Sequence, residues 1–337
     1  MDIKEIPVDR LRGYIIGFFT SMNGGKTEAL VNELERAKHS GFNVIAYGNT
    51  LNTRDCGCLQ IDERIKFPAV SSSSIKELKE DLENRLSFLE QNKASSGSSK
   101  IIYGGVEHAR GLPLLAVGID EANLFTLNER AAQDFVEFLL WVRKKGLVLY
   151  VSGLEYDFRD MNFGNIDAVI RRLNVKIDKK PVCKAITNGK QCGMPANHTQ
   201  RVWLKDFASE IGCADLIEKL GDYDFASKEG NLILSEYVPA PFFDKTVRIE
   251  QKREDGKHRI AYLPTCWDCA KVPFKKETFT VYDAIIKKED PAKAEVDPLV
   301  RDRILNFLLE ENWVEKKEGL LEPINYHKNL LGGYSPH

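Results

Sequence analysis

Residues 19–27, with the sequence F-T-S-M-N-G-G-K-T, constrain the fold of this chain more than any other segment. They follow an apolar run at 14–18 and open a segment of helical periodicity, which predicts a strand, a tight glycine turn and a helix. In that arrangement the backbone N–H groups of the turn face an anion, as in a phosphate-binding loop. Lys26 would reach the outer phosphates of a nucleoside triphosphate, and Thr27 would offer its hydroxyl to Mg²⁺. A strict G-x-x-x-x-G-K-[ST] pattern has glycine where this chain has Thr20, so an ordinary strand–turn–helix is the alternative.

Short apolar runs alternate with amphipathic segments through the first half of the chain. The alternation predicts an α/β fold of the P-loop NTPase type, with a parallel sheet flanked by helices and a nucleotide at the carboxyl ends of the strands. Serine-rich stretches at 71–74 and 95–99 are interpreted as mobile loops. The predicted strands lie at 14–18, 44–47, 101–103, 114–119 and 147–151, and the predicted helices lie at 27–39, 75–91 and 129–144.

Composition narrows the class of protein only modestly. The 337 residues include 48 basic and 50 acidic ones, so a net charge of −2 provides no field that favours nucleic acid or a membrane surface. Residues 1–12 lack the apolar core of a signal peptide, and no apolar run approaches the roughly 20 residues of a membrane span. A cytoplasmic protein is predicted. Seven cysteines in that compartment indicate free thiols or a metal site rather than disulfides.

The apolar run at 114–119 ends in Asp120 and Glu121. A P-loop protein needs an acidic group at the tip of such a strand to hold Mg²⁺, directly or through water, so Asp120 is the candidate. Glu121 would then be a base beside the transferred phosphate. The alternative is that the two carboxylates cap the segment that follows, since acidic residues are common at helix starts.

These motifs, taken in order, resemble the type II thymidine kinases, which are P-loop deoxynucleoside kinases with a zinc-bearing lasso domain. S-M-N-G-G-K-T resembles the S-x-M-N-A-G-K-S loop of bacterial members, and residues 119–125, I-D-E-A-N-L-F, resemble I-D-E-x-Q-F-F. Asn52-Thr53-Arg54 resembles the family's D-x-R. Arg64 with Pro68-Ala69 is similar to S-R-x-G-x-x-x-P-A. The most specific segment is 153–159, G-L-E-Y-D-F-R, which is close to G-L-x-x-D-F-R.

The resemblance implies a role for each matching residue. Asp120 would assist Mg²⁺, and Glu121 would take the proton of the nucleoside 5′-hydroxyl, with Lys26 and Arg54 completing the catalytic set. The substrate pocket would be lined by Phe125, Phe158 and Tyr262, although a plain core position is the alternative for the two phenylalanines. The phosphates of ATP would be held by Ser21, Met22, Asn23, Gly24, Gly25, Lys26 and Thr27.

The cysteines extend the resemblance to a structural Zn²⁺ site. Cys266-x-x-Cys269 is a metal knuckle, and Cys183 with Cys192 can supply the other pair of a tetrahedral site. Because eight residues separate Cys183 from Cys192, the first knuckle must be enlarged. Unbound buried thiols are the alternative. His198 could compete as a ligand but is interpreted as a satisfied polar group, and the structural cysteines are Cys56, Cys58 and Cys213.

Other segments depart from the family pattern. Residues 255–258, D-G-K-H, stand where the family has a V-I-G-G lasso that closes over the base, so thymine specificity is not secured. Asn52, Asn123 and Trp267 replace the family's Asp, Gln and Arg. We expect a P-loop α/β kinase domain at 1–180, a zinc-binding lasso domain at 181–275 with an insertion at 202–259, and a helical C-terminal extension at 276–337. The insertion shows a helical pattern at 204–220 and strand-like stretches at 232–234 and 246–249, and the extension shows a helical pattern at 299–313.

The sequence therefore predicts a cytoplasmic enzyme that phosphorylates a deoxynucleoside, by resemblance thymidine, with ATP and Mg²⁺. A homo-oligomer, specifically a tetramer, is implied by the resemblance alone. A kinase for another nucleoside is one alternative. Another is a nucleotide-binding protein without turnover, whose insertion and extension form a partner-binding surface; the altered lasso and Asn52 favour it, whereas Lys26 and Glu121 favour an active enzyme. The neutral charge balance argues against a nucleic-acid-dependent ATPase.

Overall fold

The computed structural model describes residues 3–51, 57–60, 66–93, 99–227, 230–248, 253, 257–317 and 319–324. These residues form two compact units. Unit 1 contains the described residues within 1–184, 192–199 and 263–269, and unit 2 contains those within 185–191, 200–262 and 270–337. The expected three-domain division remains a prediction. In the described part of the chain, no helix is both long and apolar enough to cross a membrane.

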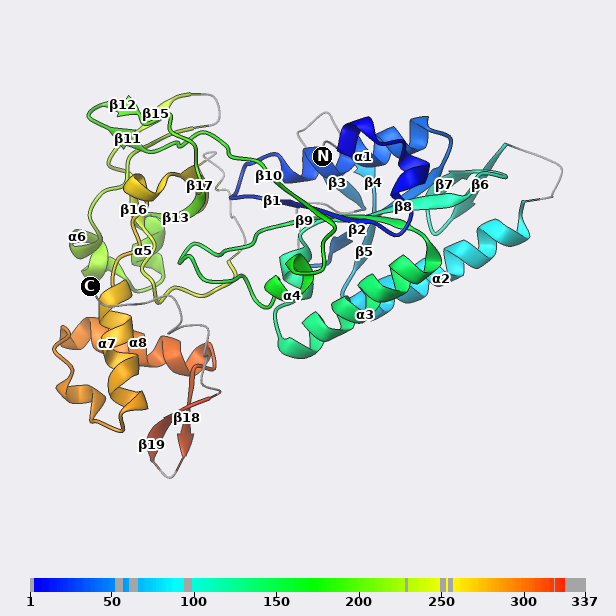
Figure 1. The fold of residues 1–337 in the computed structure, drawn as a ribbon. Helices are drawn as coiled ribbons and strands as arrows, with labels where there is room; N and C mark the ends of the chain where they lie inside the picture. Colours follow the sequence, from blue (N-terminus) through cyan, green and yellow to red (C-terminus); the bar gives the residue numbers. More distant parts are fainter. Residues whose placement is uncertain are drawn as a thin grey trace. The chain divides into compact units, whose positions relative to one another are not determined.

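Unit 1 is built on a six-stranded sheet with the order β10-β1-β9-β8-β2-β5 (Figure 1). Every neighbouring pair of strands runs parallel, which confirms the predicted α/β fold class. Strands β1, β8 and β9 are buried at every position, as expected for parallel strands covered on both faces. The strands are β1 Ile15–Phe19, β2 Asn43–Asn49, β5 Val70–Ser72, β8 Leu114–Ile119, β9 Val148–Gly153 and β10 Val175–Asp178.

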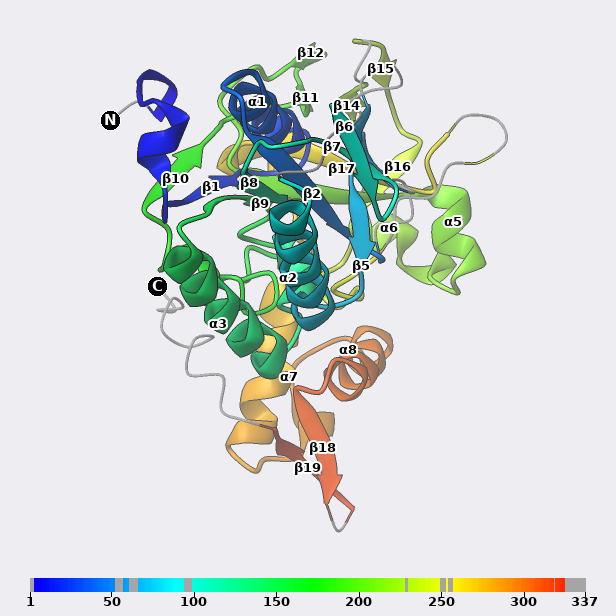
Figure 2. The same ribbon diagram turned by 90° about the vertical axis from the view of Figure 1, so that its right-hand side faces the viewer.

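Helices cover both faces of this sheet (Figure 2). Helix α1 Lys26–His39 packs on one face, while α2 Ile75–Gln91 and α3 Glu129–Lys145 pack on the other. Each of the latter two starts after a side-chain cap: Ser74 accepts the N–H of Glu77, and Asn128 accepts the N–H of Ala131. The three predicted helices are confirmed. Short elements η1 Ile3–Glu5, η2 Val8–Leu11, η3 Ala122–Phe125 and α4 Asp167–Ile170 complete this layer, with the antiparallel pair β3 Cys58–Gln60 and β4 Lys66–Pro68.

The expectation that residues 101–103 belong to the parallel sheet is wrong. Strand β6 Lys100–Tyr103 pairs antiparallel with β7 Val106–Ala109 in a separate hairpin. The two residues between them, Gly104 and Gly105, both have positive φ angles of 53° and 76°, which is the requirement of a tight two-residue hairpin turn. The local Gly-Gly signal therefore determines the partner of this apolar run.

The interpretation of residues 71–74 as a mobile loop is also wrong. Val70–Ser72 is strand β5 at the edge of the parallel sheet, and the serines that follow organise the start of α2. The hydroxyl of Ser73 donates to the Glu77 carboxylate over 2.8 Å, while Ser74 caps the helix. Most of the second serine-rich stretch, 95–99, lies outside the described residues.

Unit 2 contains the insertion and the C-terminal extension. A three-stranded sheet has the order β16-β13-β17, formed by β16 Tyr237–Pro239 with β13 His198–Leu204 and β17 Ile260–Thr265, of which residues 198–199 and 263–265 are counted in unit 1. The predicted helix at 204–220 is divided into α5 Lys205–Glu210, η4 Ala214–Leu216 and α6 Ile217–Leu220. The other pieces are the hairpin β11 Ile186–Thr187 and β12 Lys190–Gln191, the pair β14 Phe225–Ala226 and β15 Leu232–Ile233, and, in the extension, α7 Lys275–Ile286, η6 Pro291–Lys293, α8 Pro298–Glu310, β18 Val314–Lys317 and β19 Leu320–Pro323.

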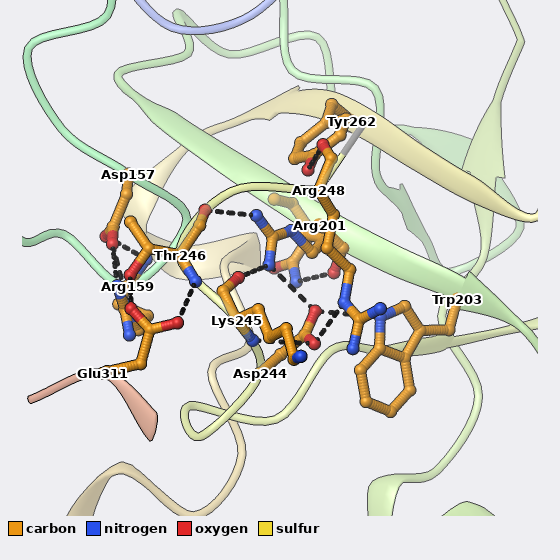
Figure 3. Close-up of polar contacts among 11 residues, drawn as sticks. Asp157, Arg159, Arg201, Trp203, Asp244, Lys245, Thr246, Arg248, Tyr262 and Glu311 are labelled. Atoms are coloured by element: carbon orange, nitrogen blue, oxygen red, sulfur yellow. Dashed lines mark hydrogen bonds and ion pairs between the residues drawn. The ribbon is translucent and has the colours of Figure 1, made fainter. Parts of the chain in front are cut away.

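Within the predicted strand at 246–249, the described residues 246–248 are not a strand. Instead, a buried ionic network fixes this part of unit 2 (Figure 3). The buried carboxylate of Asp244 accepts hydrogen bonds from Arg201 (2.8 Å), Trp203 (3.1 Å) and Arg248 (2.5 Å). Arg201 also donates to the carbonyls of Lys245 and Thr246. Backbone carbonyls that bind a buried guanidinium are withdrawn from strand pairing, which explains the irregular conformation.

Candidate active site

The phosphate loop lies between the end of β1 and the start of α1. Asn23 and Gly25 have left-handed φ angles of 59° and 70°, which turn the chain sharply into the helix. A Cβ atom added to Gly24 would lie 2.2 Å from Cγ2 of Thr20, so only glycine fits at position 24 once threonine replaces the first glycine of the usual pattern. The loop thus keeps its tight turn despite the substitution at its start.

The side chains of the loop are arranged as the motif predicts for an oxyanion site. Lys26 is buried, and its Nζ donates to the carbonyl of Ser21 over 3.2 Å. The Ser21 hydroxyl is buried and has no hydrogen-bond partner among the described residues. A buried hydroxyl without a partner is costly unless a ligand or water satisfies it. Together with the amide groups at the start of α1, this spare donor fits a bound phosphate.

Asp120 and Thr27 meet at the carboxyl ends of β8 and β1. The Thr27 hydroxyl donates to Oδ2 of Asp120 over 2.8 Å, and the buried Oδ1 atom accepts the Ser152 hydroxyl and the Glu121 N–H. A hydroxyl and a carboxylate at this distance, both hard oxygen donors, fit a Mg²⁺ ion held through one or two protein ligands. The structure therefore brings together the two residues that the sequence predicted for magnesium.

Glu121 follows in a left-handed backbone conformation with φ of 51°. Such conformations cost energy for a residue with a side chain and gather at functional sites. Although Glu121 precedes η3, its side chain does not cap that helix. The observed geometry therefore does not match the alternative in which Glu121 serves as a helix cap.

The G-L-E-Y-D-F-R segment holds the ends of β8 and β9 together. Gly153 ends β9, and the next N–H, of Leu154, donates to Oδ1 of Asn123 over 2.9 Å. Asp157 and Arg159 form a buried ion pair with a shortest distance of 2.6 Å. Phe158 lies between the two residues of this pair. The centroid of its ring is 5.4 Å from the guanidinium carbon of Arg159.

The predicted substrate residues lie in three different settings. Phe125 is part of the hydrophobic core under α2 and α3, with its ring edge-on to Phe135 at 6.4 Å. Phe158 is 1% exposed. Tyr262 belongs to unit 2, where its hydroxyl donates to the carbonyl of Arg248 over 2.7 Å. Arg54 lies outside the described residues, as do Asn52 and Arg64. The roles of these residues remain predictions.

Sequence reasoning missed two residues that support the site. Ser152, the hydroxyl partner of Asp120, is a polar residue within the otherwise apolar strand β9, which is a signal for a buried polar contact. Thr199 accepts the N–H of Met22 in the phosphate loop over 3.0 Å. Because these partners are 177 residues apart, no local pattern could identify the contact.

Four cysteines of unit 1 form a cluster. The Sγ atoms of Cys183, Cys192, Cys266 and Cys269 all lie within 4.8 Å of one another. The Cys192 and Cys266 sulfurs are 3.8 Å apart, about the edge of a tetrahedron built on Zn–S bonds of about 2.3 Å. No disulfide joins them. Four thiols at tetrahedral spacing are compatible with a metal site.

A β-hairpin accounts for the unusual spacing of the first cysteine pair. Strands β11 and β12 lie between Cys183 and Cys192 and are joined by Asn188 and Gly189, with φ angles of 52° and 73°. Asn-Gly in that conformation is the preferred two-residue hairpin turn. The enlarged knuckle that the sequence predicts is therefore a hairpin, and the chain on either side of it brings Cys183 and Cys192 to the same cluster.

The thiols have opposed electrostatic environments. Burial, reinforced by neighbouring thiols, raises the pKa of Cys269, whereas the backbone N–H of Met194 lowers the pKa of Cys192. His198 is outside the four-sulfur cluster; its Nδ1 is hydrogen-bonded to Asp160, and its Nε2 has no partner among the described residues.

Comparisons with known proteins identify similar sequences among thymidine kinases. A family model for thymidine kinase matches residues 88–220, which include the acidic pair and the first two clustered cysteines. A thymidine kinase of Mesoplasma florum is 28% identical over 186 residues, which are 54% of this chain and 72% of that protein.

Among solved structures, the cytoplasmic domain of the Thermomonospora curvata type VII secretion ATPase EccC is 8% identical, with a TM-score of 0.32. The match covers 70% of this chain and 24% of that one, and a likeness this low supports no conclusion. The family model and the Mesoplasma relative both show that this chain is similar to thymidine kinases.

Proposed function

We propose that this protein transfers the γ-phosphate of ATP to the 5′-hydroxyl of a deoxynucleoside, with thymidine as the first candidate. The contact between Thr27 and Asp120, at 2.8 Å, carries the proposal. It joins a hydroxyl from the first turn of α1 to a carboxylate at the end of β8, beside the lysine of a phosphate loop, which is the arrangement that phosphoryl transfer requires. The family match and the thymidine kinase relative support the choice of a nucleoside acceptor.

In this mechanism the protein contributes positioning and proton transfer. Lys26 and the amide groups at the start of α1 bind the phosphates and balance their charge. Glu121 accepts the proton of the 5′-hydroxyl as that oxygen bonds to the γ-phosphorus and the bond to the ADP oxygen breaks. The Asp157–Arg159 pair fixes the loop that carries Phe158. Mg²⁺, when bound beside Thr27 and Asp120, would supply charge neutralisation on the phosphate oxygens.

We further propose that the four clustered cysteines bind a structural Zn²⁺ as thiolates. All four coordination positions of the ion would then be filled by protein, which is the mark of a structural rather than a catalytic site. We also propose that the chain forms a homo-oligomer, as the family resemblance implies.

A phosphoryl-transfer assay tests the proposed activity. Purified protein is incubated with ATP, Mg²⁺ and a panel of deoxynucleosides and ribonucleosides, and nucleotide products are separated by chromatography. Glu121→Gln is expected to retain ATP binding in a thermal-shift titration while losing about 10²- to 10⁴-fold in turnover. Glu129→Gln, at an exposed position on α3, is the matched control and should retain wild-type turnover.

The outcomes separate the candidate functions. Product with thymidine supports the proposal, and product with a different nucleoside alone changes the substrate but not the reaction. ATP stabilisation without transfer to any nucleoside would indicate a nucleotide-binding protein that lacks turnover. Unchanged turnover in Glu121→Gln would exclude Glu121 as the base.

A further inference from the structure

A cavity of about 270 Å³ opens beside the phosphate loop, within unit 1. This size is close to the lower end of the range for small-ligand pockets, about 300–1,000 Å³. Its wall combines the first residues of the loop, the segment after β9, the end of β10 and the two cysteine-bearing segments. The wall includes three lysines, Lys176, Lys179 and Lys180, and the aromatic side chains of Tyr156 and Trp267.

Of the three lysines in this wall, Lys176 and Lys179 have different partners. Lys176 is neutralised by Glu155 at 2.5 Å and by Asp178 at 3.3 Å. Lys179 has no carboxylate within 4 Å among the residues that the structure describes, and its Nζ instead lies 3.4 Å from the carbonyl of Gly25 in the loop. An ammonium group without a carboxylate partner, beside a phosphate loop, is placed to bind an anion.

Thr20 holds Lys179 in this place. Its hydroxyl donates to the Lys179 carbonyl, and so fastens the extension of β10 to the start of the loop. Glycine, which the usual pattern has at this position, could not make that bond. The departure of this chain from the strict motif therefore has a structural consequence, namely a second lysine beside the loop.

Strand order indicates which end of a nucleotide this lysine would meet. The magnesium candidates Thr27 and Asp120 mark the terminal phosphates on the β8 side of β1, whereas Lys179 follows β10, on the opposite side of β1. A nucleotide with its terminal phosphates at Asp120 would therefore place its nucleoside end toward Lys179 and the cavity. The spare hydroxyl of Ser21, buried in the same wall, is available to that ligand.

Two aromatic side chains of the wall offer a surface for a base. Trp267 and Tyr156 are 58% and 46% exposed. The Trp267 ring contacts the ring of His198, with centroids 5.9 Å apart and ring planes tilted by 50°. An exposed indole held by such a contact is suited to stacking against a base.

We propose that Lys179 is a second phosphate-binding lysine and that the cavity beside it, with Trp267, takes the purine nucleoside of the phosphate donor. The inference rests on the nucleotide-binding part of the proposed function. It adds a charged contact at the phosphate nearest the nucleoside and an aromatic contact at the base.

Calorimetric titration with ATP, ADP and inorganic tripolyphosphate, without a nucleoside acceptor, tests both contacts. Lys179→Ala should weaken ATP and ADP binding by about 10- to 100-fold, the effect of losing a hydrogen bond to a charged group. Trp267→Leu should weaken both nucleotides about 10-fold while leaving tripolyphosphate unchanged. Lys179→Arg and Trp267→Phe, which keep the charge and the ring, should recover most of the affinity.

Lys144→Ala, at an exposed position on α3, is the charge-matched control, and Lys26→Ala is the reference for loss of the phosphate loop. Wild-type ATP affinity in Lys179→Ala and Trp267→Leu, with loss in Lys26→Ala, would overturn the inference and leave the proposed function standing. Nucleotide binding with the expected dependences but no phosphoryl transfer would support the inference and refute the kinase. Absence of ATP binding by the wild-type protein would overturn both.

Discussion

His108 lies buried on β7, with its Nε2 atom 3.4 Å from a guanidinium nitrogen of Arg85. Burial, reinforced by the Arg85 charge, lowers the pKa of His108 to about 4, and the Asp81 carboxylate that pairs with Arg85 opposes this shift without cancelling it. The unfolded chain takes up a proton at this residue near pH 6.5, whereas the folded chain does so only near pH 4. The stability that neutral His108 contributes is therefore present above pH 6.5 and is lost as the pH falls toward 4.

We expect the free energy of unfolding to decrease between pH 6.5 and pH 4, and to decrease less steeply in His108→Gln, because glutamine cannot take up the proton. Urea unfolding of both proteins at pH 7.5, 6.5, 5.5 and 4.5 measures the difference. Parallel pH profiles for the two proteins would show that another group carries the dependence.

At the scale of single residues, the sequence predicts what is encoded locally. Lys26 and Thr27 could be identified because the loop places them through a few consecutive backbone angles, and Asp120 because it ends an apolar run. Ser152 could be recognised only as a polar residue in an apolar strand, and Lys179 not at all, since both lie beside the loop only through the order of strands in the sheet. That order depends on packing across the whole unit, which no local motif records.

Two glycines in different strands of the parallel sheet provide a matched test of how closely the backbone is packed at each position. Gly153 ends β9, and a Cβ atom there would lie 2.8 Å from Oδ1 of Asn123 and 3.2 Å from the N atom of Ala122. Gly48 lies in β2, where, among the described residues, an added Cβ meets only Cδ2 of Leu59, at an ordinary 3.8 Å. The same substitution should therefore have different consequences in the two strands.

Gly153→Ala is expected to destabilise the protein by about 1–3 kcal/mol, because backbone and a buried amide must shift to admit the methyl group. It should also lower turnover, because a shift of Asn123 would displace the nearby residues Asp120 and Glu121. Gly48→Ala should stay within about 0.5 kcal/mol of wild type. Denaturant unfolding and the phosphoryl-transfer assay measure the two effects, and equal stabilities for the two variants would contradict the proposed role of the Gly153 contact.

At the scale of elements, helices were more predictable than strand partners. Residues 75–91 and 129–144 show sustained 3.6-residue periodicity after a capping residue, and both specify one packing face. Strands β5 and β10 are short edge strands with exposed or polar positions, so they lack the apolar run by which the central strands were identified. Residues 101–103 have such a run but pair in a hairpin, because apolar character does not specify a partner.

At the scale of the whole molecule, unit 1 consists of three separate stretches of chain. Each stretch contributes to the cysteine cluster. The first stretch supplies Cys183, the second supplies Cys192, and the third supplies Cys266 and Cys269. A metal ion bound there would close one short loop, residues 184–191, and one long loop, residues 193–265, at one point. Such a closure constrains the unfolded state much as a disulfide does. The second stretch also contains Thr199, which holds Met22 in the phosphate loop.

Removal of the metal should therefore lower both stability and nucleotide affinity. We expect the purified protein to contain about one zinc per chain, and chelation to cost about 3 kcal/mol of stability, by analogy with removal of a long-range crosslink. That loss corresponds to a fall in Tm of roughly 6–12 °C. Elemental analysis and thermal unfolding, with and without a zinc chelator, measure the zinc content and the stability, and titration with ATP measures the nucleotide affinity.

Two cysteine variants provide the control. Cys183→Ser should reproduce the chelated state, whereas Cys58→Ser, outside the cluster, should retain zinc, Tm and ATP affinity. Because Cys183 is fully buried, a fall in Tm alone does not identify the metal; a zinc-free protein whose Tm does not respond to chelator would show that the four thiols stabilise the fold by packing instead.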